Sequence, residues 1–225
     1  KVIFAKGYGW QDYENRIPVK ADTSMFRPGS VSKLFTWTAV MQMVEQGKLD
    51  LDTDVNNYLK TFQIPATYAE PITLRHIMTH TAGFEEGGLG YLIMLDPAKA
   101  LPLKVAMAKY IPRRINKPGA YASYSNYAPA LAGLMVENVS GTPFNQYIEE
   151  NIFKPLGMNS SSFEEPLPEA LHKNMAVGHK REAGLLKPEP FEIISSFSPA
   201  GALSSTATDM AKFMMAHLNN GRLGD

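Results

Sequence analysis

Hydrophobic and polar positions recur along the chain in patterns that predict a mixture of helices and strands. Residues 2–10 alternate as a strand does, and residues 11–15 form a polar turn. The strongest helical pattern covers residues 30–46 and is closed by Gly47; its apolar spacing is carried by Val31, Leu34, Phe35, Thr38, Met41 and Val44. This spacing predicts a helix buried in the middle of the fold.

Further helices are expected over residues 73–80, 102–110, 127–139 and 142–152, the last with Pro143 at its first position. Residues 166–190 are polar and irregular. Thr206 and Asp209 have the spacing of a capping box, which predicts a final helix that ends near residues 219–221.

Composition narrows the possible functions only a little. The chain has 225 residues, 44% of them hydrophobic, so it can bury a sizeable core. Its 22 basic and 22 acidic residues cancel, which argues against a nucleic-acid or anionic membrane partner. The sequence has no cysteine, which excludes thiol nucleophiles and zinc–thiolate sites, and no apolar run reaches the roughly 18 residues that a membrane span needs.

Ser30-Val31-Ser32-Lys33, at the start of the first predicted helix, is the clearest candidate for chemistry. Residues three apart share one face of a helical turn, so the Lys33 amine is expected to reach the Ser30 hydroxyl. A serine needs a nearby base to act as a nucleophile, and the start of a helix favours a developing negative charge. The ordinary alternative is that Ser30 is only an N-cap.

Tyr124-Ser125-Asn126, before another predicted helix, offers a second proton carrier. An ammonium group beside a phenol makes the phenol easier to ionise, so a Lys33–Tyr124 pair is suited to move the serine proton. The Asn126 amide carries both a donor and an acceptor, as binding a peptide-like group requires. The alternative for Tyr124 is a packing role.

Other motifs fit chemistry less well. Tyr13-Glu14-Asn15 repeats the Tyr-x-Asn spacing, but it falls in a polar turn with no helix after it. His76 and His80 are four apart, a spacing that metal ligands use, but Ile77 stands where a zinc hydrolase helix has glutamate. We therefore expect no metal and no cofactor.

These motifs, in this order, resemble the serine β-lactamases and penicillin-binding proteins, in the Tyr-x-Asn branch with class C β-lactamases, D-alanyl-D-alanine carboxypeptidases, D-aminopeptidases and esterases. The similar segments are residues 7–9, 26–54, 71–83, 118–126, 140–142, 155–158 and 200–209. The resemblance implies that Ser30 is the acylated nucleophile and Lys33 its partner. It also implies that Tyr124 is the general base and acid, that Asn126 contacts the substrate, and that the protein works outside the cytoplasm.

The resemblance implies an α/β fold of the α+β type, with an antiparallel sheet flanked by helices and a mostly helical lobe. We expect the sheet-side lobe over residues 1–48 and 188–225, and the helical lobe over residues 49–187. The family's third motif, Lys-Thr-Gly or His-x-Gly on a late strand, does not occur in this sequence. We therefore expect one incomplete catalytic domain over residues 1–225, whose sheet is completed by a further C-terminal segment or a second chain.

The expected function is that of a serine acyl-transfer hydrolase, with a β-lactam, a D-amino-acid peptide or a small ester as the substrate partner. The alternative is a catalytically impaired relative that binds a ligand or acts as a scaffold. The four residues Ser30, Lys33, Tyr124 and Asn126 favour the enzyme. The missing third motif favours the scaffold.

Overall fold

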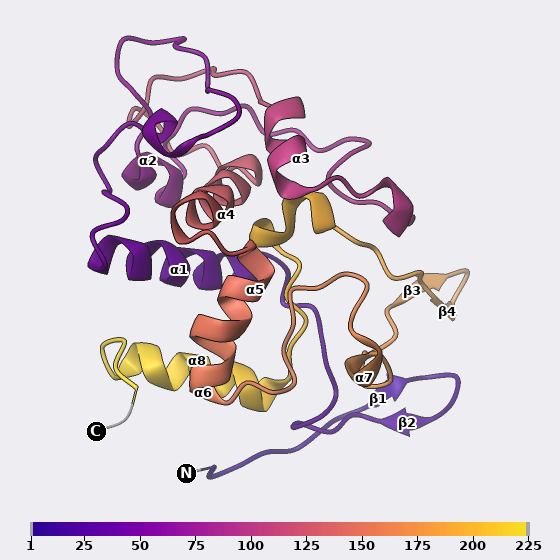
Figure 1. Ribbon diagram of the computed structural model, residues 1–225. Coiled ribbons are helices and arrows are strands. Elements are labelled where there is room, and N and C mark those ends of the chain that lie inside the picture. Colours follow the sequence, from indigo (N-terminus) through magenta and orange to yellow (C-terminus); the bar gives the residue numbers. More distant parts are fainter. Residues whose placement is uncertain (1, 224–225) are drawn as a thin grey trace.

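Helices form most of the regular structure in the computed structural model, which describes residues 2–223 (Figure 1). The α-helices are α1 (Lys33–Glu45), α2 (Leu74–Met78), α3 (Leu103–Lys109), α4 (Tyr127–Ser140), α5 (Phe144–Ile148), α6 (Lys154–Leu156), α7 (Glu169–His172) and α8 (Ala207–Leu218). Short 3₁₀ helices cover Gly29–Ser32, Val55–Tyr58, Pro97–Lys99 and Ser195–Ala200. Lys1, Gly224 and Asp225, the ends of the expected 1–225 domain, lie outside the described residues.

The centre of the helical body is α4, rather than the first helix. Every residue from Tyr127 to Val136 is buried, and α4 packs against α1, α2, α3 and the 3₁₀ helix Ser195–Ala200. Gly133 permits the last of these contacts, because a Cβ there would lie 2.3 Å from Cγ of Pro199. A helix that is apolar on all sides is a buried helix, and α4 fits this description.

α1 is buried on one face only, so the prediction of a helix buried in the middle of the fold holds for that face and not for the other. Its inner face packs against α4, α5 and the 3₁₀ helix Ser195–Ala200, whereas three of the predicted core positions are exposed. The buried side chains of α1 are Lys33, Phe35, Thr36, Ala39, Val40 and Met43. The exposed core positions are Leu34 and Met41 in α1 and Val31 in the turn before it. The predicted start also differs, since residues 29–32 form a 3₁₀ turn before the α-helix begins.

Strands are few and short in the part of the chain that the structure describes, and its two sheets are antiparallel hairpins (Figure 1). β1 (Trp10–Asp12) pairs with β2 (Ile17–Pro18), so only residue 10 of the strand expected over residues 2–10 is in a strand. β1 continues through residues 11 and 12, and the turn expected over residues 11–15 covers residues 13–16. β3 (His179–Glu182) pairs with β4 (Leu185–Pro188) inside the segment expected to be irregular. The two-residue turn between them, Ala183 and Gly184, has positive φ at both positions, as tight hairpin turns require.

The remaining predicted helices differ mainly in extent. α2 ends at Met78, short of His80, and the helix expected over residues 142–152 is α5 followed by a π-helical turn, Glu149–Phe153, that leads into α6. At α8 the Thr206 side chain accepts the Asp209 N–H. The Asp209 carboxylate accepts from Ser160, Ser161 and Lys212 instead of returning to Thr206, so one half of the expected capping box forms.

Candidate active site

Ser30 and Lys33 lie on one face of the turn that leads into α1, as their spacing predicts. Lys33 Nζ donates to Ser30 Oγ over 3.0 Å. The serine is exposed, whereas the lysine side chain belongs to the inner face of α1 and its residue is only 4% exposed. The accessible hydroxyl is therefore held by a cation that solvent hardly reaches.

Tyr124 and Asn126 converge on the same point from the segment that precedes α4. Tyr124 Oη donates to Ser30 Oγ over 2.8 Å, and Asn126 Oδ1 accepts from Lys33 Nζ over 2.8 Å. The four residues named from the sequence are thus brought together, although they come from two distant segments. The Tyr13-Glu14-Asn15 motif lies in the turn between β1 and β2, where Asn15 bonds Asp12.

The Lys33 amine makes a third bond that the sequence did not indicate. Its Nζ donates to the backbone carbonyl of Ala200 over 2.7 Å, at the end of the 3₁₀ helix Ser195–Ala200. Thr36 anchors the same 3₁₀ helix by donating to the Pro199 carbonyl. An ammonium group has three hydrogens, and Ser30, Asn126 and Ala200 accept all three.

Glu86 is the second contributor that sequence reasoning missed. Its carboxylate oxygens accept from the Asn126 backbone N–H over 2.9 Å and from Asn126 Nδ2 over 2.7 Å. An exposed glutamate before the glycine-rich residues 87–90 resembles an ordinary solvated charge, so no signal in the sequence singled it out.

His80 supports the tyrosine and does not sit on a helix with His76. Its ring stacks on Tyr124 with centroids 4.5 Å apart, and its Nδ1 accepts the Ser125 N–H. Burial lowers the pKa of His80, the nearby Lys33 charge lowers it further, and Glu86 opposes both. His76 bonds Thr73 through its own Nδ1, so the two histidines serve separate local contacts.

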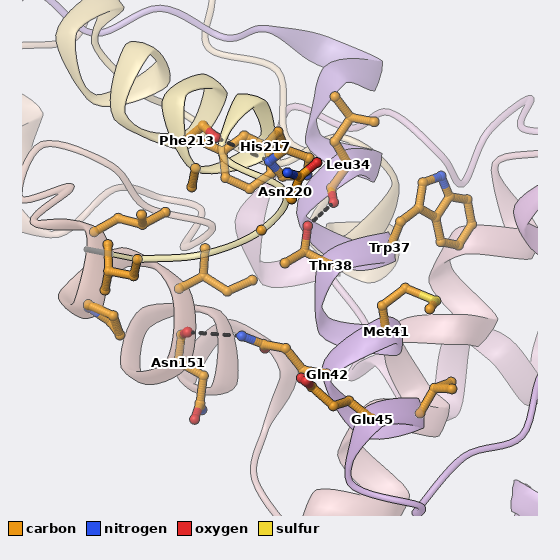
Figure 2. Close-up of a pocket in the computed structure, with 17 residues that line it drawn as sticks. Leu34, Trp37, Thr38, Met41, Gln42, Glu45, Asn151, Phe213, His217 and Asn220 are labelled. Carbon is orange, nitrogen blue, oxygen red and sulfur yellow. Dashed lines mark hydrogen bonds between the residues drawn. The ribbon is translucent and has the colours of Figure 1, made fainter. Parts of the chain in front are cut away.

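A large groove lies elsewhere, along the outer face of α1. Its volume is about 740 Å³, and Leu34, Trp37 and Met41 from α1 line it together with Phe213, His217 and Asn220 (Figure 2). Ser30, Tyr124 and Asn126 do not line it. We take the contacting polar groups at Ser30, rather than this apolar groove, as the candidate site, because chemistry needs convergent polar groups.

This structure combines helices with small antiparallel sheets. Its fold is that of the β-lactamase/transpeptidase-like proteins. The Beta-lactamase family model matches residues 1–225, and this chain belongs to that family. The expected family and fold class are thereby confirmed. The roles of the individual site residues stay predictions.

Individual relatives agree with this assignment. A putative penicillin-binding protein PbpX of Bacillus subtilis is 31% identical over 99% of this chain and 53% of its own length. The octameric penicillin-binding protein homologue from Pyrococcus abyssi is 30% identical, with a TM-score of 0.83, over 99% of this chain and 51% of that one. EstCE1, a hydrolase with promiscuous acyltransferase activity, is 26% identical, with a TM-score of 0.80, over 100% of this chain and 66% of that one.

The chain spans about half the length of the curated relatives it matches. These relatives include penicillin-binding proteins and a β-lactamase-like protein, and the similar solved structures include a hydrolase. No helix within residues 2–223 is both long and apolar enough to cross a membrane.

Proposed function

We propose that this chain carries the acylation site of a serine hydrolase, with Ser30 as the nucleophile. The observation that supports this most directly is the position of Ser30 Oγ, 3.0 Å from Lys33 Nζ and 2.8 Å from Tyr124 Oη. Both distances are within hydrogen-bond reach, which is the first requirement for a base that removes the serine proton. An N-cap role does not account for two charged or ionisable partners on one hydroxyl.

The proposed reaction forms and breaks an acyl-enzyme. Ser30 Oγ attacks the carbonyl carbon of an amide or ester while its proton passes to the oxygen of an ionised Tyr124, whose negative charge the Lys33 ammonium stabilises. Tyr124 then gives that proton to the leaving amine or alcohol as the carbonyl–heteroatom bond breaks. A water molecule, deprotonated by Tyr124, then attacks the carbonyl of the acyl-enzyme ester. As the bond to Ser30 Oγ breaks and the acid is released, Tyr124 gives that proton to Ser30 Oγ.

The substrate class is proposed from the names of the relatives together with the polar character of the site. Penicillin-binding proteins and an acyltransferase-type hydrolase are among the similar proteins, so a β-lactam, a D-amino-acid peptide and a small ester all remain candidates. Asn126 is the residue we expect to contact the substrate amide. An amide-bearing substrate would use its donor and acceptor, whereas an ester would use only its donor.

A second candidate function is a relative that binds or traps its ligand without turnover. Lys-Thr-Gly and His-x-Gly, which the resemblance implies for one wall of the site, do not occur within these 225 residues, so labelling has to separate the two functions. In this case Ser30 would be acylated once and the adduct would persist.

Covalent labelling tests the proposal. The protein is incubated with a fluorescent β-lactam or a fluorophosphonate, and the modified peptide is located by mass spectrometry. We expect an adduct on Ser30 and none in Ser30→Ala, because that change removes one exposed oxygen and leaves the packed side of α1 intact. Following release of the label over time separates a hydrolase from a trap.

Two neighbouring serines supply matched controls. Ser32 is buried and accepts the Leu203 N–H, and the Ser125 hydroxyl accepts the Ala128 N–H. Ser32→Ala and Ser125→Ala are expected to retain labelling, per molecule of folded protein. A label on either of these residues in the wild type would overturn the assignment of Ser30.

A further inference from the structure

The side-chain amide of Asn126 lies between an anion and a cation. On one side, Asn126 Nδ2 donates to Glu86 Oε1 over 2.7 Å, and the backbone N–H of the same residue donates to Glu86 Oε2 over 2.9 Å. On the other side, Asn126 Oδ1 accepts from Lys33 Nζ over 2.8 Å. Each end of the amide therefore meets a partner of complementary charge.

We propose that Glu86 is a positioning residue, which fixes the orientation of the Asn126 amide and, through it, the Lys33 amine beside Ser30. This role rests on the proposed function, because it matters for activity only if Lys33 and Ser30 act as proposed. Glu86 itself makes no bond to Ser30, Lys33 or Tyr124 among the hydrogen bonds of residues 2–223.

The charges allow only one orientation of the amide. In the reverse orientation, Nδ2 would point at the Lys33 ammonium, and Oδ1 would point at the Glu86 carboxylate. The first pair consists of two donors and the second of two acceptors, so two favourable contacts would become two repulsive ones. Lys33 is almost fully buried, so loss of one acceptor would leave an ammonium hydrogen without a partner where water does not replace it.

The Glu86 carboxylate is available to bind Asn126, because it forms no ion pair with another described residue. It also lies at the start of α4, where Asn126 is the residue that precedes the first helical position. A negative charge is favoured at that end of a helix, so the same bond holds the loop of Glu86 against α4.

Nuclear magnetic resonance of the Asn126 side-chain amide tests this orientation without depending on activity. The amide signals are identified by their loss in Asn126→Ala. We expect Glu86→Gln to shift them, because a glutamine has one acceptor oxygen where the carboxylate offers two, so one of the two Asn126 donors loses its bond. Glu85→Gln, a change at the exposed neighbouring glutamate, should leave them in place.

The rate of covalent labelling of Ser30 by a fluorescent β-lactam or fluorophosphonate provides the functional readout. Glu86→Gln is expected to slow it about tenfold, as loss of one charge-assisted hydrogen bond implies. Glu85→Gln should leave it unchanged. In an Asn126→Ala background the further effect of Glu86→Gln should fall below about twofold, because a residue that acts through Asn126 has no effect once that amide is removed.

The outcomes separate the two proposals. Amide signals that do not move in Glu86→Gln, or equal effects of this change with and without the Asn126 amide, would overturn the positioning role. A wild type that is never labelled on Ser30 would overturn the proposed function, while the amide signals would still decide the role of Glu86. Glu86→Asp keeps the charge but is shorter by one methylene; a full wild-type rate in that variant would show that charge alone, rather than the paired bonds, is what matters.

Discussion

The two long faces of α1 are covered very differently, although both are apolar. The inner face carries Phe35, Ala39 and Met43, all with 1% exposure or less, and it packs against α4, α5 and the 3₁₀ helix Ser195–Ala200. The outer face carries Leu34 and Met41, which are 47% and 42% exposed and line the groove of Figure 2.

The candidate site belongs to the inner face. Lys33 lies at the first turn of that face, and two of its three acceptors come from elements packed there, the start of α4 and the end of the 3₁₀ helix Ser195–Ala200. One face of α1 therefore contributes to the apolar groove, and the other contributes Lys33 to the candidate site. This difference between the faces implies that changes on the inner face should affect both stability and chemistry, whereas changes on the outer face should affect neither strongly.

The largest expected effect concerns proton transfer. Tyr124→Phe keeps the ring that stacks on His80 and removes only the hydroxyl that reaches Ser30. The rate of acylation should fall by about 10²–10⁴-fold, the usual contribution of a positioned general base. Lys33→Ala should be at least as damaging, and Met41→Ala, on the outer face, should leave the rate unchanged. Labelling kinetics measure all three, and a folded Tyr124→Phe protein with the wild-type rate would reduce Tyr124 to a packing residue.

A change in the aromatic cluster beneath α1 should have the largest effect on stability. The Phe35 ring stacks on Phe213 with centroids 3.8 Å apart and meets Phe153 and Phe163 edge-on. Phe35→Ala leaves a cavity among these rings, so the free energy of unfolding should fall by about 3–5 kcal/mol. Urea denaturation of the variant and the wild type measures this difference. A loss below about 1 kcal/mol would mean that the cluster collapses around the missing ring.

Sequence patterns predicted the parts of the fold and site that depend on local spacing. Ser30 and Lys33 are one turn apart, so their contact follows from helical geometry. Helices α3, α4 and α8 also lie close to their expected ranges, because strong apolar periodicity and caps mark them. Tyr124 was placed at the site by motif and resemblance, since nothing local joins it to Ser30.

The rest of the site depends on contacts without a sequence signature. A backbone carbonyl such as that of Ala200 has no residue type, and an exposed Glu86 resembles any solvated carboxylate. The exposure of the outer face of α1 was not predicted. Apolar spacing shows which side chains share a face, but it does not show whether another element covers that face. The hairpin of β3 and β4 was not predicted because β3 is wholly polar and neither strand has a buried residue, so no alternation of buried and exposed positions marks it.

A buried carboxyl group beside the start of the 3₁₀ helix Ser195–Ala200 should make stability depend on pH. Glu165, whose side chain is fully buried, accepts from Arg27 on the segment before Ser30 and from the Ile194 N–H before the 3₁₀ helix Ser195–Ala200. Burial raises the pKa of Glu165 to about 7, although the bond from Ile194 and the Arg27 charge oppose the shift. A raised pKa in the folded state means that the bound proton stabilises the fold. This contribution is complete below about pH 4.5 and is lost as the pH rises through 7.

The matched variant for this effect is Glu165→Gln, which cannot titrate. The free energy of unfolding of the wild type, minus that of the variant, should fall by about 2–3 kcal/mol between pH 4.5 and pH 8, since each unit of pKa shift corresponds to about 1.4 kcal/mol. Urea denaturation at several pH values measures the difference, in which the titration of other groups common to both proteins cancels. Parallel profiles would show that Glu165 titrates at its ordinary pKa.

The smallest expected effect lies on the outer face of α1. Leu34 is adjacent to Phe35 in the sequence, but it lies on the outer face of the helix, whereas Phe35 lies on the inner face. Because nearly half of Leu34 is already exposed, Leu34→Ala should cost no more than about 1 kcal/mol of the free energy of unfolding, well below the cost of Phe35→Ala. Urea denaturation of both variants at one pH makes the comparison directly. Equal costs at Leu34 and Phe35 would mean that the outer face is as well packed in solution as the inner one, and would remove the contrast between the two faces of α1.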